Sequence, residues 1–172
     1  MIDGGRMRPE YRRMIESVEG NLRRYRKLLQ GLRSKRSADL DAVFQDATEK
    51  AFDEIDCLEC ANCCVTTGPR VLERDIDRIS RMLKRRPSEW TEEFLRRDED
   101  DDWVFRHLPC PFLREDNYCA IYPQRPKACR EYPHTDSRHI HQLFHKTIRN
   151  AVICPIAARV LQLVDLHYGG SK

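Results

Sequence analysis

The sequence predicts a mostly α-helical fold with a small β-hairpin element: a single compact, metal-stapled domain preceded by a long N-terminal helical hairpin. Two observations support this. Apolar residues recur every three or four positions along much of the chain, as in amphipathic helices. Eight cysteines gather between the helical segments, beside short runs that have the turn residues of a hairpin. We place the domain boundary after residue 56, which gives domains 1–56 and 57–172.

The first helical segment runs from Pro9 to about Arg33. Residues 1–36 contain 11 Lys and Arg against four Asp and Glu, a charge that suits a nucleic acid or an anionic membrane. Gly20 and Gly31 each weaken the helix by about 1 kcal/mol relative to Ala. Its apolar seam has the spacing of a heptad pattern and comprises Tyr11, Ile15, Val18, Leu22, Tyr25, Leu29 and Leu32.

The second helical segment is acidic. Residues 37–56 contain seven Asp and Glu and one Lys, and Ser37 is a suitable cap for the helix. A basic helix followed by an acidic one predicts an antiparallel hairpin with complementary charge, which we favour over a nucleic-acid-binding arm. We therefore expect a protein partner for these helices rather than a nucleic acid. The apolar stripe comprises Leu40, Val43, Phe44, Ala47, Ala51 and Ile55.

The remaining elements follow the cysteine cluster. We expect helices over 72–84, from Ser88 through Leu95, over 137–150 and from Pro155 to about His167, with a short helix around Cys129. The stretch from Trp103 to Leu108 reads as a strand, and the turn at 115–117 predicts a hairpin with 118–122. Five acidic residues at 98–102 lack the alternating spacing of a calcium loop, so we expect an exposed turn there.

The chain shows no export or membrane signal, so we expect a cytoplasmic protein. Its opening residues lack the apolar core of a secretory signal, and the apolar stretch 151–164 is too short and interrupted to cross a bilayer. Because the cytosol disfavours disulfides, clustered thiols there indicate metal binding or redox chemistry. The cysteines are Cys57, Cys60, Cys63, Cys64, Cys110, Cys119, Cys129 and Cys154.

The densest cluster, Cys57-x2-Cys60-x2-Cys63-Cys64, has the spacing with which a tight backbone turn brings thiolates together on a metal. On an extended segment, neighbouring side chains point to opposite sides, so Cys63 and Cys64 could serve two centres. Eight thiols suffice for two four-thiolate sites. The spacing and the Cys-Pro steps favour iron, nearby histidines favour zinc, and both metals stay open. The alternative is buried free cysteine, above all for Cys154.

Charged residues near Cys129 are further candidates. Arg125 and Arg130 flank it, and a guanidinium would lower thiol pKa values and offset the charge of a cluster, although ion pairs to Glu131 or to the acidic helix are equally consistent. Four histidines lie nearby: His134, His139, His141 and His145. The last two are four residues apart, a spacing suited to metal, but a surface or core role is commoner.

These blocks together resemble the CxxCxxCC cysteine-cluster family of YkgJ-like zinc- or iron-chelating proteins. The resemblance covers residues 57–155 and rests on the cluster itself, Cys110-Pro-Phe-Leu113, Cys119-Ala-Ile-Tyr122, Arg125-Pro126-x2-Cys129-Arg130-x-Tyr132-Pro133 and Cys154-Pro155. It implies metal binding, with an iron–sulfur cluster or zinc as cofactor. We expect Cys57, Cys60 and Cys63 to be the core ligands, with the other five cysteines completing that site or a second one. It leaves open whether the protein is an enzyme with redox or modification activity, a structural zinc module that binds a protein, or a nucleic-acid binder.

Overall fold

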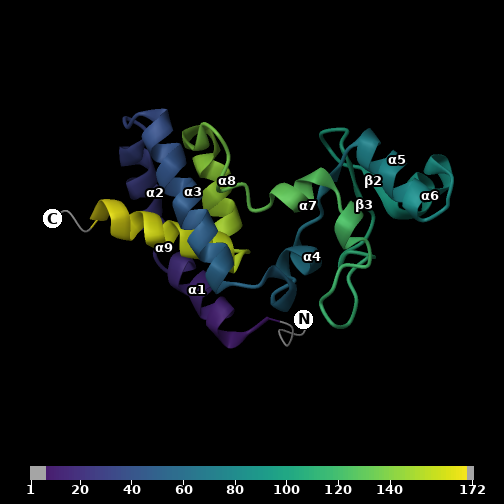
Figure 1. Ribbon diagram of the computed structural model, residues 1–172, viewed down its shortest axis with the longest axis horizontal. Helices are drawn as coiled ribbons and strands as arrows, with labels where there is room; N and C mark the ends of the chain where they lie inside the picture. Colours follow the sequence, from purple (N-terminus) through teal and green to yellow (C-terminus); the bar gives the residue numbers. More distant parts are fainter. Residues whose placement is uncertain (1–6, 170–172) are drawn as a thin grey trace. The chain divides into compact units, whose positions relative to one another are not determined.

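The computed structural model describes residues 7–169, so the parts of the predicted domains at 1–6 and 170–172 lie outside it. It confirms a mostly α-helical fold with a small antiparallel sheet. The chain forms two compact units (Figure 1). Unit 1 comprises the described residues up to Cys60 and from Pro133 onward, and unit 2 comprises Ala61–Tyr132. The boundary after residue 56 stays a prediction.

Unit 1 is helical, and its C-terminal helix packs against helices from both stretches of sequence that build the unit. Helix α9 contacts α1, α3 and α8, and Figure 1 shows α3 crossing it. The predicted apolar seams supply the interior, as in Val18, Leu40 and Phe44, which are fully buried. The elements are α1 (Pro9–Glu19), α2 (Leu22–Leu32), α3 (Ser37–Glu54), η1 (Cys57–Glu59), η3 (Ile140–Leu143), α8 (Phe144–Ala151) and α9 (Pro155–Gly169).

The single helix predicted over 9–33 is wrong, because the chain breaks into α1 and α2 at Gly20 and Asn21. Gly20 ends α1, and the Asn21 side-chain amide donates to the Ser17 carbonyl at 2.8 Å, a local bond that competes with the helix. The seam still turns inward on both sides of the break, since Val18 and Tyr25 are buried. Glycine therefore interrupts the helix without changing its buried face.

Helix α9 supplies opposite charges to both neighbours. Arg24 of α2 lies 2.6 Å from Asp165, and Glu54 of α3 lies 2.6 Å from Arg159. Charge pairing between the basic and acidic helical segments themselves stays a prediction. None of the helices within residues 7–169 has the length and apolarity to span a membrane.

Unit 2 holds a three-stranded antiparallel sheet in the order β1-β3-β2. Its central strand, β3, pairs Val104 with Arg70 of β1 and Phe105 with Leu95 of β2. The elements are α4 (Asn62–Thr66), β1 (Arg70–Val71), α5 (Glu73–Met82), α6 (Pro87–Phe94), β2 (Leu95–Arg97), β3 (Trp103–Phe105), η2 (Tyr122–Gln124) and α7 (Lys127–Glu131).

The strand expected at 103–108 is therefore present at 103–105, but its predicted partner is wrong. The segment 118–122 contributes only an isolated bridge, Leu113 to Cys119, whereas β3 pairs with β2 across the acidic turn. Asp98 shapes that turn, because its Oδ1 accepts the backbone N–H groups of Asp100 and Asp102, both at 3.0 Å. The acidic run is a hairpin turn in which the Asp98 carboxylate bonds locally, whereas the Asp102 carboxylate pairs with Arg70 of β1 at 2.8 Å.

Trp90 lies at the centre of the unit 2 interior. It is fully buried and contacts the rings of Phe94, Phe105 and Phe112 at centroid distances of 5.8–6.4 Å. Cys110 and Cys119 pack against the edge of this cluster. The apolar interior of unit 2 and its thiols thus adjoin.

Two helix starts differ from the prediction. Helix α6 begins at Pro87, with Arg86 in the cap position, so Ser88 lies in its first turn instead of capping it. The helix expected over 137–150 begins later, as the short η3 followed by α8, because His139 has a left-handed backbone (φ 56°) that a helix cannot contain.

Candidate metal centre

Unit 2 brings cysteines from three separate blocks of sequence toward one another. The backbone N–H of Cys110 donates to the carbonyl of Cys64 at 2.7 Å, which ties the two segments directly. The chain reverses direction between Cys110 and Cys119. The backbone N–H of Ala120 donates to the carbonyl of Phe112 at 2.8 Å, and Cys119 pairs with Leu113 in an antiparallel β-bridge. Cys110 and Cys119 therefore sit on a backbone held at both ends, as metal ligands require.

Cys129 joins this set from α7. Its N–H donates to the Pro126 carbonyl at 3.0 Å, which fixes it in the first turn of that helix. Burial raises the pKa of Cys129, and thiolates at Cys64, Cys110 and Cys119 raise it further. Burial likewise raises the pKa of Cys110 to about 12, with smaller contributions from Cys64 and Cys119. Cys64, Cys110 and Cys119 thus lie near enough to Cys129 to raise its pKa, and we call these four cysteines the unit 2 thiol set.

Three cysteines gather in unit 1. Cys57 and Cys60 are linked by a hydrogen bond from Cys60 N–H to Cys57 carbonyl at 3.2 Å, and Cys154 precedes α9. Burial raises the pKa of Cys154 to about 12, and Cys60 and then Cys57 contribute to the rise. Cys57, Cys60 and Cys154 form the unit 1 thiol set.

Cys63 lies beside Cys64 on α4. The assumption that both stand on an extended segment is wrong, since Asn62–Thr66 is helical and adjacent side chains there differ by about 100° around the axis. A hydrogen bond from Cys63 lowers the pKa of Cys64. The structure places Cys63 with the unit 2 thiols.

The thiols are close without having the geometry of ligands. Within residues 7–169, no group of three or more His, Cys, Asp or Glu side chains is arranged so that it could hold a metal ion. The chemistry of the sets nevertheless fits the metals expected, because thiolate sulfur is the ligand that zinc and iron–sulfur clusters prefer in sites of this kind. Binding would require side-chain rotation and loss of the thiol protons.

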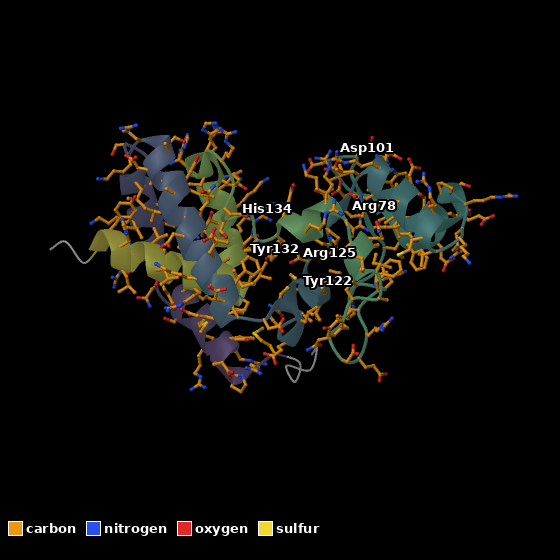
Figure 2. The ribbon with its side chains drawn as sticks, viewed as in Figure 1. Arg78, Asp101, Tyr122, Arg125, Tyr132 and His134 are labelled. Carbon is orange, nitrogen blue, oxygen red and sulfur yellow. The ribbon has the colours of Figure 1, made fainter. Side chains whose placement is uncertain are left out.

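The two arginines near Cys129 have different surroundings. Arg125 stacks on the Tyr122 ring at 3.9 Å and is the cation that acts to lower the pKa of both Cys119 and Cys129, although burial outweighs it (Figure 2). Arg130 donates to the Arg125 carbonyl at 2.9 Å. Glu131, the alternative partner, lies 3.3 Å from Lys127. A role for either arginine toward a cofactor stays a prediction.

The structure brings His139 and His141 together, whereas the sequence had pointed to His141 and His145 as a pair. The Nδ1 atoms of His139 and His141 lie 3.1 and 3.5 Å from the Ser37 hydroxyl, and their ring centroids are 6.2 Å apart. His145 is exposed on α8, in the turn after His141. This hydroxyl contact favours a structural role for His139 and His141.

Asp75 and Arg78 on α5 were missed by the sequence analysis. Asp75 is fully buried and pairs with Arg78 at 2.7 Å, and both contact the segment that leads to Cys129. The available signal was an acidic residue three positions after Leu72, the pattern of a helix start. That pattern does not reveal a distant backbone partner.

Comparison with known families matches residues 56–155 to the CxxCxxCC family, whose description reads "Putative zinc- or iron-chelating domain". The matched segment spans more than half of the chain and contains all eight cysteines, of which Cys154 is the last. The metals of that description are the two expected, iron or zinc. Comparisons with curated proteins and with solved structures find no match.

Proposed function

Because this chain belongs to the CxxCxxCC family, we propose that it binds zinc or iron through thiolates of the unit 2 thiol set, Cys64, Cys110, Cys119 and Cys129. The observation that supports the proposal is the backbone hydrogen bond that ties Cys110 to Cys64, together with the contributions of Cys64, Cys110 and Cys119 to the raised pKa of Cys129. Four thiolates complete a tetrahedral shell, so such a site would be closed and structural.

The unit 1 thiol set is proposed as a second, separate site. Three thiolates leave one position of a tetrahedral shell for a further ligand. Any redox or modification activity would belong to a site of that open kind, whereas a closed site would serve folding and binding to a protein partner. In the reducing cytoplasm, where we propose that the protein acts, both sets would remain available to metal.

The first test compares metal content between matched variants of α7. We expect Cys129→Ser to lose the unit 2 metal while retaining any metal of the unit 1 set, because one of four ligands is removed. Its neighbour Ala128→Ser adds a hydroxyl on the same helix and should retain full metal content. Proteins are purified anaerobically and measured by elemental analysis and absorption spectroscopy.

The outcomes are distinct. Visible absorption with labile sulfide would identify an iron–sulfur cluster, and colourless protein with stoichiometric zinc would identify zinc. A wild-type chain without bound metal after exposure to both would contradict the proposal. Equal metal content in Cys129→Ser and wild type would contradict the assignment of Cys129.

A second candidate function rests on the basic face of α2. Arg23, Arg26 and Lys27 lie on one exposed face, and within the described residues none of them is within 4 Å of a carboxylate. The opposite face, with Tyr25 and Leu29, is buried, so the helix has no free apolar side for a membrane. Exposed cations without acidic neighbours favour contact with phosphate groups of a nucleic acid.

Salt dependence tests this candidate. We expect duplex DNA or RNA to bind the full chain with an affinity that falls as salt rises, and Arg23→Gln with Arg26→Gln to reduce the salt slope by about two. Anisotropy titrations at several salt concentrations measure both. Arg81→Gln, on an exposed position of α5, serves as the control. Equal slopes for all three proteins would contradict the candidate.

A further inference from the structure

Asp75 is a buried carboxylate in the first turn of α5 with three separate donors. Its Oδ1 accepts from Arg78 Nη2 at 2.7 Å, and its Oδ2 accepts the N–H of Leu72 at 3.1 Å. The N–H of Lys127 lies 3.3 and 3.2 Å from the two oxygens. Burying a charge is costly unless it is paired and hydrogen-bonded, and here both conditions hold.

Arg78 extends the same contact along the chain. Its Nη2 also lies 3.0 Å from the Arg125 carbonyl and 3.3 Å from the Gln124 carbonyl. Its Nε is buried and, among the described residues, has no hydrogen-bond partner. A buried N–H group without a partner is energetically unfavourable. Arg78 nevertheless keeps the orientation in which its Nη2 donates to the carbonyls of residues 124 and 125.

Residues 124–127 form the turn between two thiols, Cys119 and Cys129. The carbonyl of Pro126, inside this turn, accepts the N–H of Cys129. Asp75 and Arg78 therefore hold the turn from one side while the turn fixes the first residues of α7.

We propose that Asp75 and Arg78 are positioning residues for Cys129, holding it where the unit 2 thiol set converges and thereby slowing release of the bound metal. The inference rests on the proposed function, since it presupposes metal at this set. Outer groups that orient ligands change metal affinity by about 10–100-fold. Neither residue would touch the metal.

The test compares neighbours on one helix. Asp75→Asn removes the charge and retains the shape, and Asp77→Asn makes the same change at an exposed position two residues later. Arg78→Lys keeps the charge but loses the planar group that reaches the carbonyls, with Arg81→Lys as its exposed counterpart. Each full-length protein is loaded with zinc, and transfer of zinc to a chromogenic chelator is timed.

We expect Asp75→Asn and Arg78→Lys to release zinc about 10–100 times faster than wild type, with both controls unchanged. Cobalt substitution supplies a readout that stability alone would not move, because at full occupancy the cobalt absorption reports ligand geometry. We expect the band to shift in both variants. Alkylation of Cys129 by iodoacetamide, quantified by mass spectrometry, should also accelerate relative to Cys119.

Unchanged release, cobalt spectrum and alkylation, alongside a lowered unfolding midpoint, would overturn the inference by showing a structural role only. If Asp75→Asn does not fold, Arg78→Lys decides the question alone, because it retains the buried carboxylate and a cation. Wild-type protein without metal would instead overturn the proposed function, so the two failures are distinguishable.

Discussion

The two units differ in what can hold them together. Unit 1 packs α1, α3 and α8 on α9 through long apolar faces, and its fully buried residues come from every one of these helices. Unit 2 has roughly 70 residues, short elements and one apolar cluster. That cluster comprises Val71, Ile76, Ile79, Trp90, Leu95, Phe105, Phe112 and Ile121.

The difference predicts which unit depends on the proposed metal for its stability. Domains below about 70–80 residues rarely gain enough from one hydrophobic core and commonly add a disulfide or a metal. Unit 2 has that size, and its thiol set lies against the edge of its core through Cys110 and Cys119. Unit 1 has the larger apolar interior, so we expect it to fold without metal.

Removal of metal should therefore have the largest effect and should separate the units. Both tryptophans, Trp90 and Trp103, lie in unit 2, so tryptophan fluorescence reports on that unit alone. We expect a chelator to red-shift the emission while far-UV circular dichroism keeps most of its helical signal. Structural zinc contributes about 10–16 kcal/mol of binding free energy that is also folding free energy. Loss of both signals together would contradict the comparison.

Core truncation should give the next largest effect, confined to one unit at a time. Ile79 in unit 2 and Leu161 in unit 1 are both fully buried. We expect Ile79→Ala and Leu161→Ala each to lower the free energy of unfolding of the metal-loaded protein by about 2–5 kcal/mol. Urea titrations should show the first in fluorescence and the second in circular dichroism. A shift of both transitions by either variant would show that the units unfold as one.

The ion pair between α3 and α9 should give the smallest effect. The hydrogen bond from Arg159 lowers the pKa of Glu54. The ion pair therefore stabilises the folded protein fully above the usual carboxyl pKa, and this stabilisation disappears as pH falls through the lowered pKa of Glu54. The pair is partly exposed to solvent, which screens it, so Glu54→Gln should cost about 0.2–1 kcal/mol near neutral pH. Thermal unfolding at neutral pH and at pH 3 measures it. A cost that persists unchanged at the lower pH would contradict this origin.

The sequence revealed buried faces more reliably than boundaries or partners. The heptad spacing identified Val18 and Tyr25 as buried, because a helix places residues three and four apart on one side whatever else it contacts. It did not reveal the break at Gly20, where a local side-chain bond competes with the helix. Strand partners are non-local, so the pairing of β3 with β1 and β2 was inaccessible from a local pattern.

The candidate site shows the same limit. The spacing of the cysteines predicted metal binding by thiols, and the family match covers residues 56–155, which contain all eight cysteines. Which of them bind metal stays a prediction. Their division between units depends on contacts across the chain, such as Cys64 with Cys110, which spacing cannot supply. Asp75 carried the signal of a helix start only, because its contact with Lys127 exists only in the folded unit.

Unit 1 is discontinuous in sequence, and this bears on the order of events during synthesis. The contacts of α1 and α3 with α9 close over more than a hundred residues, which is slow in folding and cannot occur before the last helix leaves the ribosome. Unit 2 is a continuous stretch that is fully synthesised earlier. The metal site that we propose at Cys64, Cys110, Cys119 and Cys129 would thus be complete in the nascent chain while α1 and α3 still lack their partner α9.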